Sequence, residues 1–128
     1  MRVLLDTHAF LWLDAARSKL SATAAAIFQN PDNEVYLSIA SLWEIQIKAQ
    51  LGRLSLRLPL PALVRDQQAA NGLRLLPMAP EHIYGLASLP PLHGDPFDRV
   101  LLAQAQTEKL ALMSSDSALA AYGVKLLW

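Results

Sequence analysis

Cysteine is absent from this 128-residue sequence. Its absence excludes a disulfide framework, a thiolate zinc site and a cysteine nucleophile, so any bound metal must be held by oxygen or imidazole ligands. Aromatic residues are also few, at 7% of the chain. Their scarcity argues against a function built on stacked bases.

An excess of charge of either sign is missing as well, because 11 Lys and Arg residues balance 11 Asp and Glu residues. This balance argues against a partner bound through a broadly basic surface. No apolar run approaches the roughly 20 residues that span a bilayer, and Asp6 and His8 interrupt the apolar stretch that a secretory signal requires. We therefore expect a cytoplasmic protein with no membrane segment.

Hydrophobic residues, by contrast, make up 53% of the chain, and charged residues only 17%. This composition excludes disorder as the default state. A chain of this length buries about two-thirds of its unfolded surface on folding. We expect one folded domain that covers residues 1–128.

Short apolar runs alternate with longer helical patterns, which is typical of βα units around a mostly parallel sheet. The five predicted strands are residues 3–5, 35–37, 73–76, 110–113 and 124–127. Helix starts are marked by Ser21, Ser38, Pro61, Pro80 and the Asp95-Pro96 pair, and helix ends or turns by Gly52, Gly72 and Gly123. Residues 53–58 alternate with period two and are interpreted as an extended edge piece, and residues 89–94 as a stiff loop.

Four carboxylates lie in apolar sequence context, where an ionised group needs a compensating partner: Asp6, Glu44, Asp98 and Asp116. Asp6 ends the first predicted strand and Asp116 closely follows the fourth. Open parallel sheets place their ligands at this carboxyl edge. The alternative for both residues is a role as the N-cap of the following helix.

Glu44 lies within a predicted helix over residues 39–51. Its apolar stripe is predicted to consist of Ile39, Ala40, Trp43, Ile47 and Leu51. Glu44 falls on the border of this stripe, from which its side chain reaches inward. The alternative is an i,i+4 ion pair with Lys48 on a solvated flank.

Asp98 lies on the same face of its predicted helix as the apolar residues Phe97, Leu101, Leu102 and Ala105. A charged residue on this otherwise apolar face is unexpected. The alternative is a capping pair in which Asp95 is the N-cap. If the four carboxylates converge, their repulsion calls for a cation, and Mg²⁺ or Mn²⁺ is the ion that such oxygen ligands favour. A site of this kind suits hydrolysis of a phosphodiester.

Four ordered motifs resemble those of the PIN-domain ribonucleases, and more narrowly the VapC-type toxins of type II toxin-antitoxin modules. They are LLDTHAFLW at residues 4–12, SIASLWEI at 38–45, HGDPFDR at 93–99 and SSD at 114–116. The resemblance implies a PIN-like three-layer α/β sandwich with a central, mostly parallel five-stranded sheet. It also implies an endoribonuclease that depends on Mg²⁺ or Mn²⁺, forms a homodimer and is inhibited by a cognate antitoxin.

The family's acidic quartet carries over onto Asp6, Glu44, Asp98 and Asp116 as catalytic residues and metal ligands. Asp98 is chosen over Asp95 as the third acid because its predicted geometry points inward. Supporting roles fall on four further residues, Thr7, Ser114, Asp95 and Arg99. Thr7 and Ser114 stand where the family places hydroxyls near the metal, and each is otherwise a plausible cap.

Arg99 is a candidate for the scissile phosphate or for an ion pair with Asp95. His8 and His93 flank motif residues and are candidates for substrate contact or for a structural role. Trp12 and Trp43 fit helical apolar stripes, which favours packing in the core or in a dimer over base stacking.

Three other classes compete with this interpretation. A phosphoacceptor receiver domain requires paired acids after the first strand and an acceptor Asp after a central strand, and residues 36–38 supply no acid. A nuclease acting on DNA flaps normally needs insertions that this chain lacks. A catalytically silent PIN-like module that binds RNA or protein would be marked by loss of a quartet member, and all four acids are present.

Overall fold

The structure is a computed structural model that describes residues 1–92 and 94–128. Its strands are β1 (Arg2–Leu5), β2 (Glu34–Ser38), β3 (Arg74–Leu76), β4 (Ala111–Met113) and β5 (Leu126–Leu127). Its α-helices are α1 (Thr7–Ala15), α2 (Ala22–Gln29), α3 (Ile39–Gln50), α4 (Leu60–Asn71), α5 (Pro80–Gly85) and α6 (Pro96–Glu108). Short 3₁₀ helices are η1 (Arg17–Lys19), η2 (Leu86–Ser88) and η3 (Ser117–Tyr122).

The five strands form one sheet with the order β3-β2-β1-β4-β5, and every neighbouring pair is parallel. In the central register, Val3 lies opposite Val35 on one side and Ala111 on the other. The strands lie where the apolar runs predicted them, shifted or trimmed by at most two residues at an end. The prediction of a parallel five-stranded α/β sheet is confirmed.

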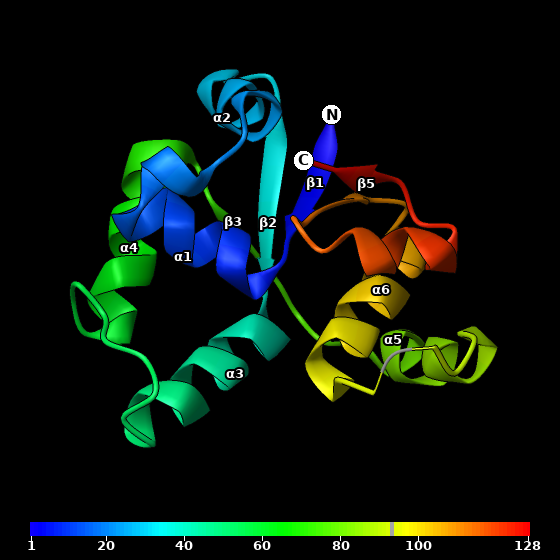
Figure 1. Ribbon diagram of the computed structural model, residues 1–128. Coiled ribbons are helices and arrows are strands. Elements are labelled where there is room, and N and C mark those ends of the chain that lie inside the picture. Colours follow the sequence, from blue (N-terminus) through cyan, green and yellow to red (C-terminus); the bar gives the residue numbers. More distant parts are fainter. Residues whose placement is uncertain (93) are drawn as a thin grey trace.

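Helices cover both faces of the sheet, as Figure 1 shows: α1, α2 and α4 lie on one side, and α5 and α6 on the other. A buried cluster that includes Phe10, Leu13 and Leu63 fills the first interface, and one that includes Leu101 and Leu112 fills the second. Because both faces of the central strands are covered, their residues are apolar throughout rather than alternating. The fold is thus the expected three-layer sandwich.

The capping signals predicted the helix starts correctly. The hydroxyls of Ser21 and Ser38 accept backbone hydrogen bonds at the starts of α2 and α3. Pro61, Pro80 and Pro96 occupy the first turns of α4, α5 and α6, where a missing N–H costs nothing. Within the described residues, no helix is both long and apolar enough to cross a membrane.

The prediction of an extended edge piece at residues 53–58 is wrong, because this segment pairs with no strand. Leu54, Leu56 and Leu58 pack against the core while the residues between them face solvent, which produces the period-two pattern without a sheet. We call residues 51–59, which join α3 to α4, the α3–α4 connection.

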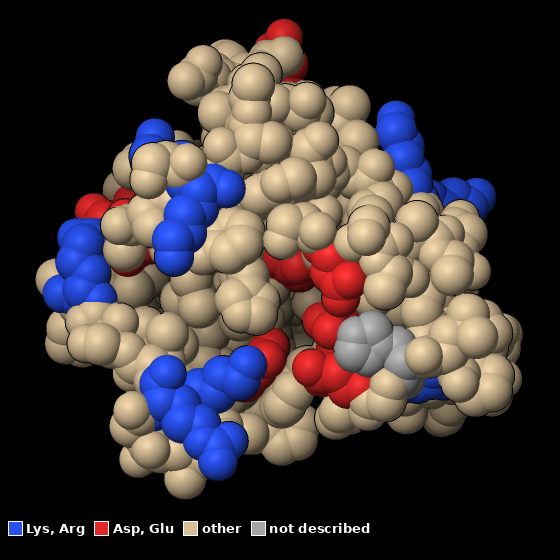
Figure 2. All heavy atoms as spheres, viewed as in Figure 1, with Lys and Arg blue, Asp and Glu red and all other residues tan. Residues whose placement is uncertain are grey.

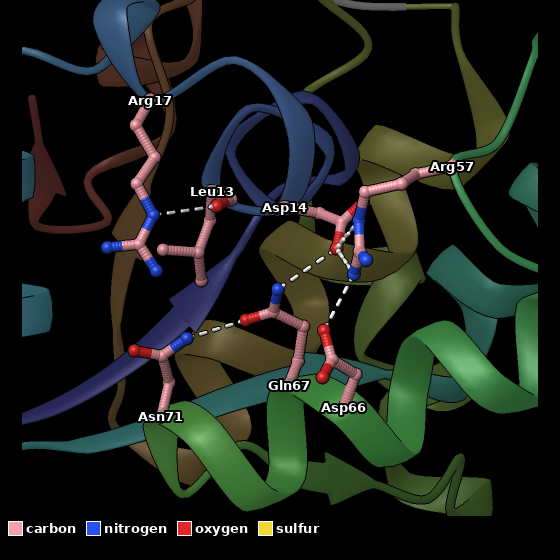
Figure 3. Close-up of polar contacts among 7 residues, drawn as sticks. All are labelled: Leu13, Asp14, Arg17, Arg57, Asp66, Gln67 and Asn71. Carbon is pink, nitrogen blue, oxygen red and sulfur yellow. Dashed lines mark hydrogen bonds and ion pairs between the residues drawn. The ribbon is translucent and has the colours of Figure 1, made fainter.

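The α3–α4 connection is fastened to two helices by Arg57 (Figure 3). The Arg57 guanidinium bonds Asp14 of α1 at 2.8 Å and Asp66 of α4 at 2.6 Å. Gln67 donates a further hydrogen bond to Asp14 at 3.0 Å and accepts one from Asn71 at 2.6 Å. This network holds the connection against the α1 and α4 layer.

The prediction of which face of α3 is buried is wrong. Ala40 is buried and Ile47 is half-buried, but Trp43 and Leu51 are each 60% exposed. The helix buries Ser41, Glu44 and Ile45 instead. Since α3 crosses the carboxyl edge of the sheet, where it contacts α1 and α6, its inward face meets polar groups as well as the core.

Candidate functional site

The carboxyl ends of β1 and β4 lie side by side, because these strands pair in register. Asp6 follows β1 directly, and Asp116 comes three residues after β4. Strand order reverses here, since β2 and β3 lie on one side of β1 and β4 and β5 on the other. Such a switch point is where open α/β sheets place their ligands.

A pocket of about 200 Å³ opens at this edge, and we call it the acidic pocket. The residues that line it are Asp6, Thr7, His8, Glu44, Lys48, Asp95, Asp98, Ser115 and Asp116. Figure 2 shows acidic side chains gathered in a hollow near the centre of one face of the molecule. The structure therefore brings together the four predicted acids and Asp95, from four different elements or their ends.

Asp6 lines the pocket and is only 6% exposed. Its Oδ1 accepts a hydrogen bond from the Ala9 N–H at 2.8 Å, so it caps α1 as well. Burial has the strongest effect on the pKa of the Asp6 carboxyl and raises it above its ordinary value. Hydrogen bonds from Ser114 and the Ala9 N–H and the proximity of His8 lower this pKa, while the nearby Glu44 charge raises it, and the net shift is upward. Asp6 thus serves as cap and pocket residue together, and a cation beside it would favour its ionised form.

Glu44 is 5% exposed and uses both carboxylate oxygens. Thr7 donates its hydroxyl to Oε1 at 2.6 Å, and Lys48 bonds Oε2 at 2.6 Å. The ion pair with Lys48 that we considered as an alternative does form, but Glu44 is buried in the pocket rather than on a solvated flank. Thr7 also lies 3.1 Å from the Ser41 hydroxyl. Thr7 therefore orients Glu44 and is not a helix cap.

Asp95 and Asp98 both line the pocket at the start of α6. Asp95 is the N-cap, and its Oδ1 accepts hydrogen bonds from the N–H groups of Phe97 at 2.9 Å and Asp98 at 3.4 Å. Asp98 is the third residue of the helix and is half-buried. The capping role of Asp95 is confirmed, and the choice of Asp98 as the third acid stays a prediction.

Asp116 is exposed and caps η3 by accepting a hydrogen bond from the Ala118 N–H at 3.1 Å. Its own N–H donates to the hydroxyl of Ser114 at 3.1 Å. Ser114 is buried beneath the pocket and bonds Asp6 as well. Ser114 therefore links the two acids that follow the central strands.

Arg99 does not reach the pocket. Its guanidinium donates to the carbonyl oxygens of Pro90 at 3.0 Å and Leu86 at 3.4 Å, so it ties the start of α6 to η2 and to the loop that follows η2. His8 is exposed at the pocket rim, whereas His93, the other predicted histidine, lies outside the described residues. Trp43 is largely exposed and contacts Phe97 edge-on, with 5.3 Å between ring centroids.

Sequence reasoning missed Lys48 and Ser41 as parts of the site. Lys48 appeared only as the structural alternative for Glu44, yet it lines the pocket as its one described ammonium group. The signal was its position four residues after a carboxylate on one helix. Ser41 gave no comparable signal, since only the packing of α3 on α1 brings it to Thr7.

The lining supplies five carboxylates, the oxygen ligands that Mg²⁺ and Mn²⁺ prefer. Within residues 1–92 and 94–128, however, no group of three acidic or imidazole side chains is arranged to hold a metal ion. Glu44 has Lys48 on one oxygen and Thr7 on the other. The donors thus fit a divalent cation in kind, and both Glu44 oxygens already accept hydrogen bonds from side chains of this site.

The raised pKa of Asp6 leads to a prediction for stability in the absence of metal. The pKa of Asp6 is higher in the folded protein than in the unfolded chain, so the free energy of unfolding falls as pH rises through the folded-state pKa. Asp6→Asn keeps a capping oxygen and removes the buried charge. In EDTA at neutral pH, the variant is expected to melt at a higher temperature than the wild type, and the gain should vanish in acid near the ordinary Asp pKa. Equal melting temperatures of Asp6→Asn and the wild type in EDTA at neutral pH would contradict this prediction.

The fold is shared with several solved structures. One is VapBC2 from Rickettsia felis bound to a promoter DNA fragment, with a TM-score of 0.75, 12% identity, and coverage of 98% of this chain and 97% of that chain. A second is VapBC-1 from nontypeable Haemophilus influenzae, with a TM-score of 0.66, 14% identity, and coverage of 98% of this chain and 96% of that chain. A third is a toxin-antitoxin complex from Klebsiella pneumoniae, with a TM-score of 0.55, 16% identity, and coverage of 90% of this chain and 87% of that chain. At these identities the likeness shows the fold alone.

None of the curated protein sequences matches this chain. The model of the PIN domain family, in contrast, matches residues 3–125. The match contains Asp6, Glu44, Asp98 and Asp116, and it covers nearly the whole chain. The chain therefore belongs to the PIN domain family.

Proposed function

We propose that this protein is a metal-dependent endoribonuclease that acts as the toxin of a toxin-antitoxin module. The observation that carries the proposal is the convergence of the four predicted acids in one pocket at the switch point of a PIN-family sheet. The resemblance of the four sequence motifs to VapC-type toxins supports the choice of RNA as substrate. Residues 1–128 would then form a single PIN domain.

Asp6, Glu44, Asp98 and Asp116 would hold Mg²⁺ or Mn²⁺ in this pocket. A divalent ion held there would neutralise charge on the phosphate, activate a water and stabilise the leaving oxygen. The other residues prepare the site. Thr7 fixes the orientation of Glu44, and Ser114 fixes Asp6 and the backbone of Asp116.

Lys48 offsets part of the negative charge in the pocket before a substrate arrives, since its ammonium group pairs with Glu44. Its side chain is 39% exposed, so it can also face an incoming phosphate. A water that attacks phosphorus directly leaves a 5′-phosphate and a 3′-hydroxyl. No covalent bond between enzyme and RNA forms in this scheme.

The proposed partners are a cognate antitoxin and a second copy of the chain, and the proposed location is the cytoplasm. The first partner is supported by the sequence resemblance and by the shared fold with a chain of a toxin-antitoxin complex. The homodimer is supported by the exposed apolar side chains of α3, among them Ile39 and Trp43. Apolar patches of this kind mark protein interfaces.

Growth of a bacterial host tests the toxin proposal. Induction of the wild type is expected to arrest growth, because hydrolysis of cellular RNA stops protein synthesis, and the small protein encoded next to this gene is expected to relieve the arrest. The control is a Glu44→Gln, Asp98→Asn double variant expressed at the same level, which should leave growth normal. Arrest by the double variant, or full growth with the wild type, would contradict the proposal. RNA binding without cleavage would instead favour a catalytically silent binding module.

A further inference from the structure

Lys48 is the one lysine or arginine among the described residues that line the acidic pocket. It follows Glu44 by one turn of α3, and its Nζ lies 2.6 Å from Oε2 of that carboxylate. Figure 2 shows basic side chains at the edge of the acidic hollow. A single ammonium group therefore stands against the five carboxylates of the lining.

The pair formed by Lys48 and Glu44 differs from an ordinary ion pair along a solvated helix face. The Glu44 side chain is only 6% exposed, and Thr7 donates its hydroxyl to the other carboxylate oxygen at 2.6 Å. Exposed pairs of this spacing contribute little, because water and salt screen them. Here one partner is almost removed from water, so the ammonium charge acts on the pocket with less screening.

A divalent cation bound through Glu44 would meet Lys48 at the same carboxylate. Each oxygen of an ionised carboxylate has two lone pairs, so Oε2 has room for a second partner beside the ammonium group. A cation there would stand next to the charge on Lys48, and like charges repel. Lys48 and a divalent cation therefore compete for the negative charge of Glu44.

The position of Lys48 also allows its ammonium group to withdraw. Its side chain is 39% exposed, and it lines a second hollow, of about 490 Å³, between α1 and the α3–α4 connection. A lysine carries its charge on a flexible stem of four carbons. The Nζ can thus leave Glu44 toward solvent without any change in the backbone of α3.

We propose that Lys48 is an internal counterion that competes with the divalent cation for Glu44 and so sets the Mg²⁺ concentration at which the acidic pocket fills. In the metal-free protein it stabilises the pocket by offsetting the repulsion among the carboxylates. When the divalent cation binds, part of its attraction to the pocket is lost to the repulsion from Lys48. This inference rests on the proposed function and adds a residue that regulates the same site.

The alternative is a pair that only stabilises α3. Loss of such a pair lowers the melting temperature equally with and without Mg²⁺, and it leaves the affinity for Mg²⁺ unchanged. An internal counterion has two effects of opposite sign, because its loss weakens the metal-free protein and strengthens metal binding. The two roles therefore differ in measurements that need no RNA.

The first measurement is the Kd for Mg²⁺, obtained by calorimetric titration of each protein without RNA. Lys48→Met is expected to bind Mg²⁺ about 5- to 10-fold more tightly than the wild type, because one positive charge beside the ion is gone. High salt should reduce this difference. The conservative variant Lys48→Arg keeps the charge and should bind like the wild type. The matched control is Arg65→Met, which removes a positive charge from an exposed position of α4 outside the lining and should also leave the Kd unchanged.

The second measurement is the melting temperature. In EDTA, Lys48→Met is expected to melt about 2 to 4 °C below the wild type, whereas in saturating Mg²⁺ the difference should shrink or reverse. Circular dichroism shows whether the variant is folded. If Lys48→Met does not fold in EDTA, Lys48→Gln has the same expected effects, since it retains a hydrogen-bond donor but no charge.

A double-mutant cycle tests whether Lys48 acts through Glu44. In a Glu44→Gln background, Lys48→Met should raise the affinity for Mg²⁺ by much less, because the ammonium group is no longer held in the pocket. An undiminished gain in that background would overturn the inference. So would equal Kd values for Lys48→Met and the wild type, or the same gain from Arg65→Met.

Failure of the proposed nuclease gives a different result from failure of this inference. Intact RNA in saturating Mg²⁺, together with tighter Mg²⁺ binding by Lys48→Met, would contradict the nuclease and leave the role of Lys48 standing. Cleavage of RNA by the wild type, together with an unchanged Kd in Lys48→Met, would do the reverse.

Discussion

Asp98→Asn is expected to reduce RNA cleavage by more than about 100-fold, because losing a direct metal ligand should cost more than losing a residue that orients one, which typically costs 10- to 100-fold. Asp98 lines the acidic pocket from the first turn of α6. Asparagine keeps the shape of the side chain and removes its charge. The matched variant is Asp95→Asn at the adjacent cap, which should retain most activity because an amide oxygen caps a helix nearly as well.

Thermal melts of the same variants separate a metal ligand from a structural residue. In EDTA, Asp98→Asn is expected to be more stable than the wild type, since repulsion among the pocket carboxylates is relieved. At a Mg²⁺ concentration ten times its Kd, the wild type should gain about 1.4 kcal/mol, and Asp98→Asn distinctly less. If the two respond equally to Mg²⁺ and cleave RNA equally, Asp98 is not a ligand. Loss of activity in Asp95→Asn alone would make Asp95 the third acid.

Thr7→Val is expected to lower cleavage by about 10- to 100-fold through an indirect route, as loss of a residue that orients a metal ligand does. Thr7 is buried and donates its hydroxyl to Glu44 at 2.6 Å. Valine has nearly the same shape but cannot donate a hydrogen bond. Glu44 would then keep only Lys48 as its described hydrogen-bond donor, and its carboxylate would no longer be held toward the pocket.

Thr7→Ser is the control for this prediction, because it restores the donor at the cost of one methyl group. Cleavage by the serine variant should lie close to that of the wild type. Mg²⁺ titrations of the three proteins should show weaker binding for Thr7→Val only. Wild-type cleavage and Mg²⁺ affinity in Thr7→Val would mean that Glu44 is positioned without Thr7, or that Glu44 is outside the catalytic set.

The sheet could be predicted from the sequence because each strand carries its own signal. Residues 3–5 and 35–37 are apolar throughout, as strands covered on both faces must be, and parallel pairing follows from the helices between them. The positions of Asp6 and Asp116 followed from the ends of two such strands. Both residues cap the helix that follows and also line the acidic pocket, and both roles follow from their positions at the ends of neighbouring parallel strands.

The orientation of α3 could not be predicted in the same way. Hydrophobic periodicity assumes that the most apolar face is buried, whereas here Trp43 is left 60% exposed and Glu44 is buried. The reason is tertiary: α3 packs across the strand ends, where Thr7 provides a polar partner for Glu44. The proposed homodimer would cover the part of the Trp43 side chain that stays exposed beside Phe97.

Contacts between residues distant in sequence account for the other differences. Arg99 lies within an acidic motif, yet its guanidinium donates to the carbonyl oxygens of Leu86 in η2 and of Pro90 in the following loop, outside the pocket. Residues 53–58 show the alternation of a strand because Leu54 and Leu56 pack against the core. Between them and α4, Arg57 donates a hydrogen bond to Asp14, which lies 43 positions earlier in the sequence.

The chemistry of the cut ends tests the central claim most directly, that the acidic pocket hydrolyses RNA with a divalent cation. Purified wild-type protein and the Glu44→Gln, Asp98→Asn variant are incubated with a labelled single-stranded RNA in Mg²⁺ or in EDTA, and the product ends are identified. The wild type is expected to cut only in Mg²⁺ and to leave 5′-phosphate and 3′-hydroxyl ends, with the double variant inactive. Cleavage by the wild type that persists in EDTA, or that leaves 2′,3′-cyclic phosphates, would contradict the claim.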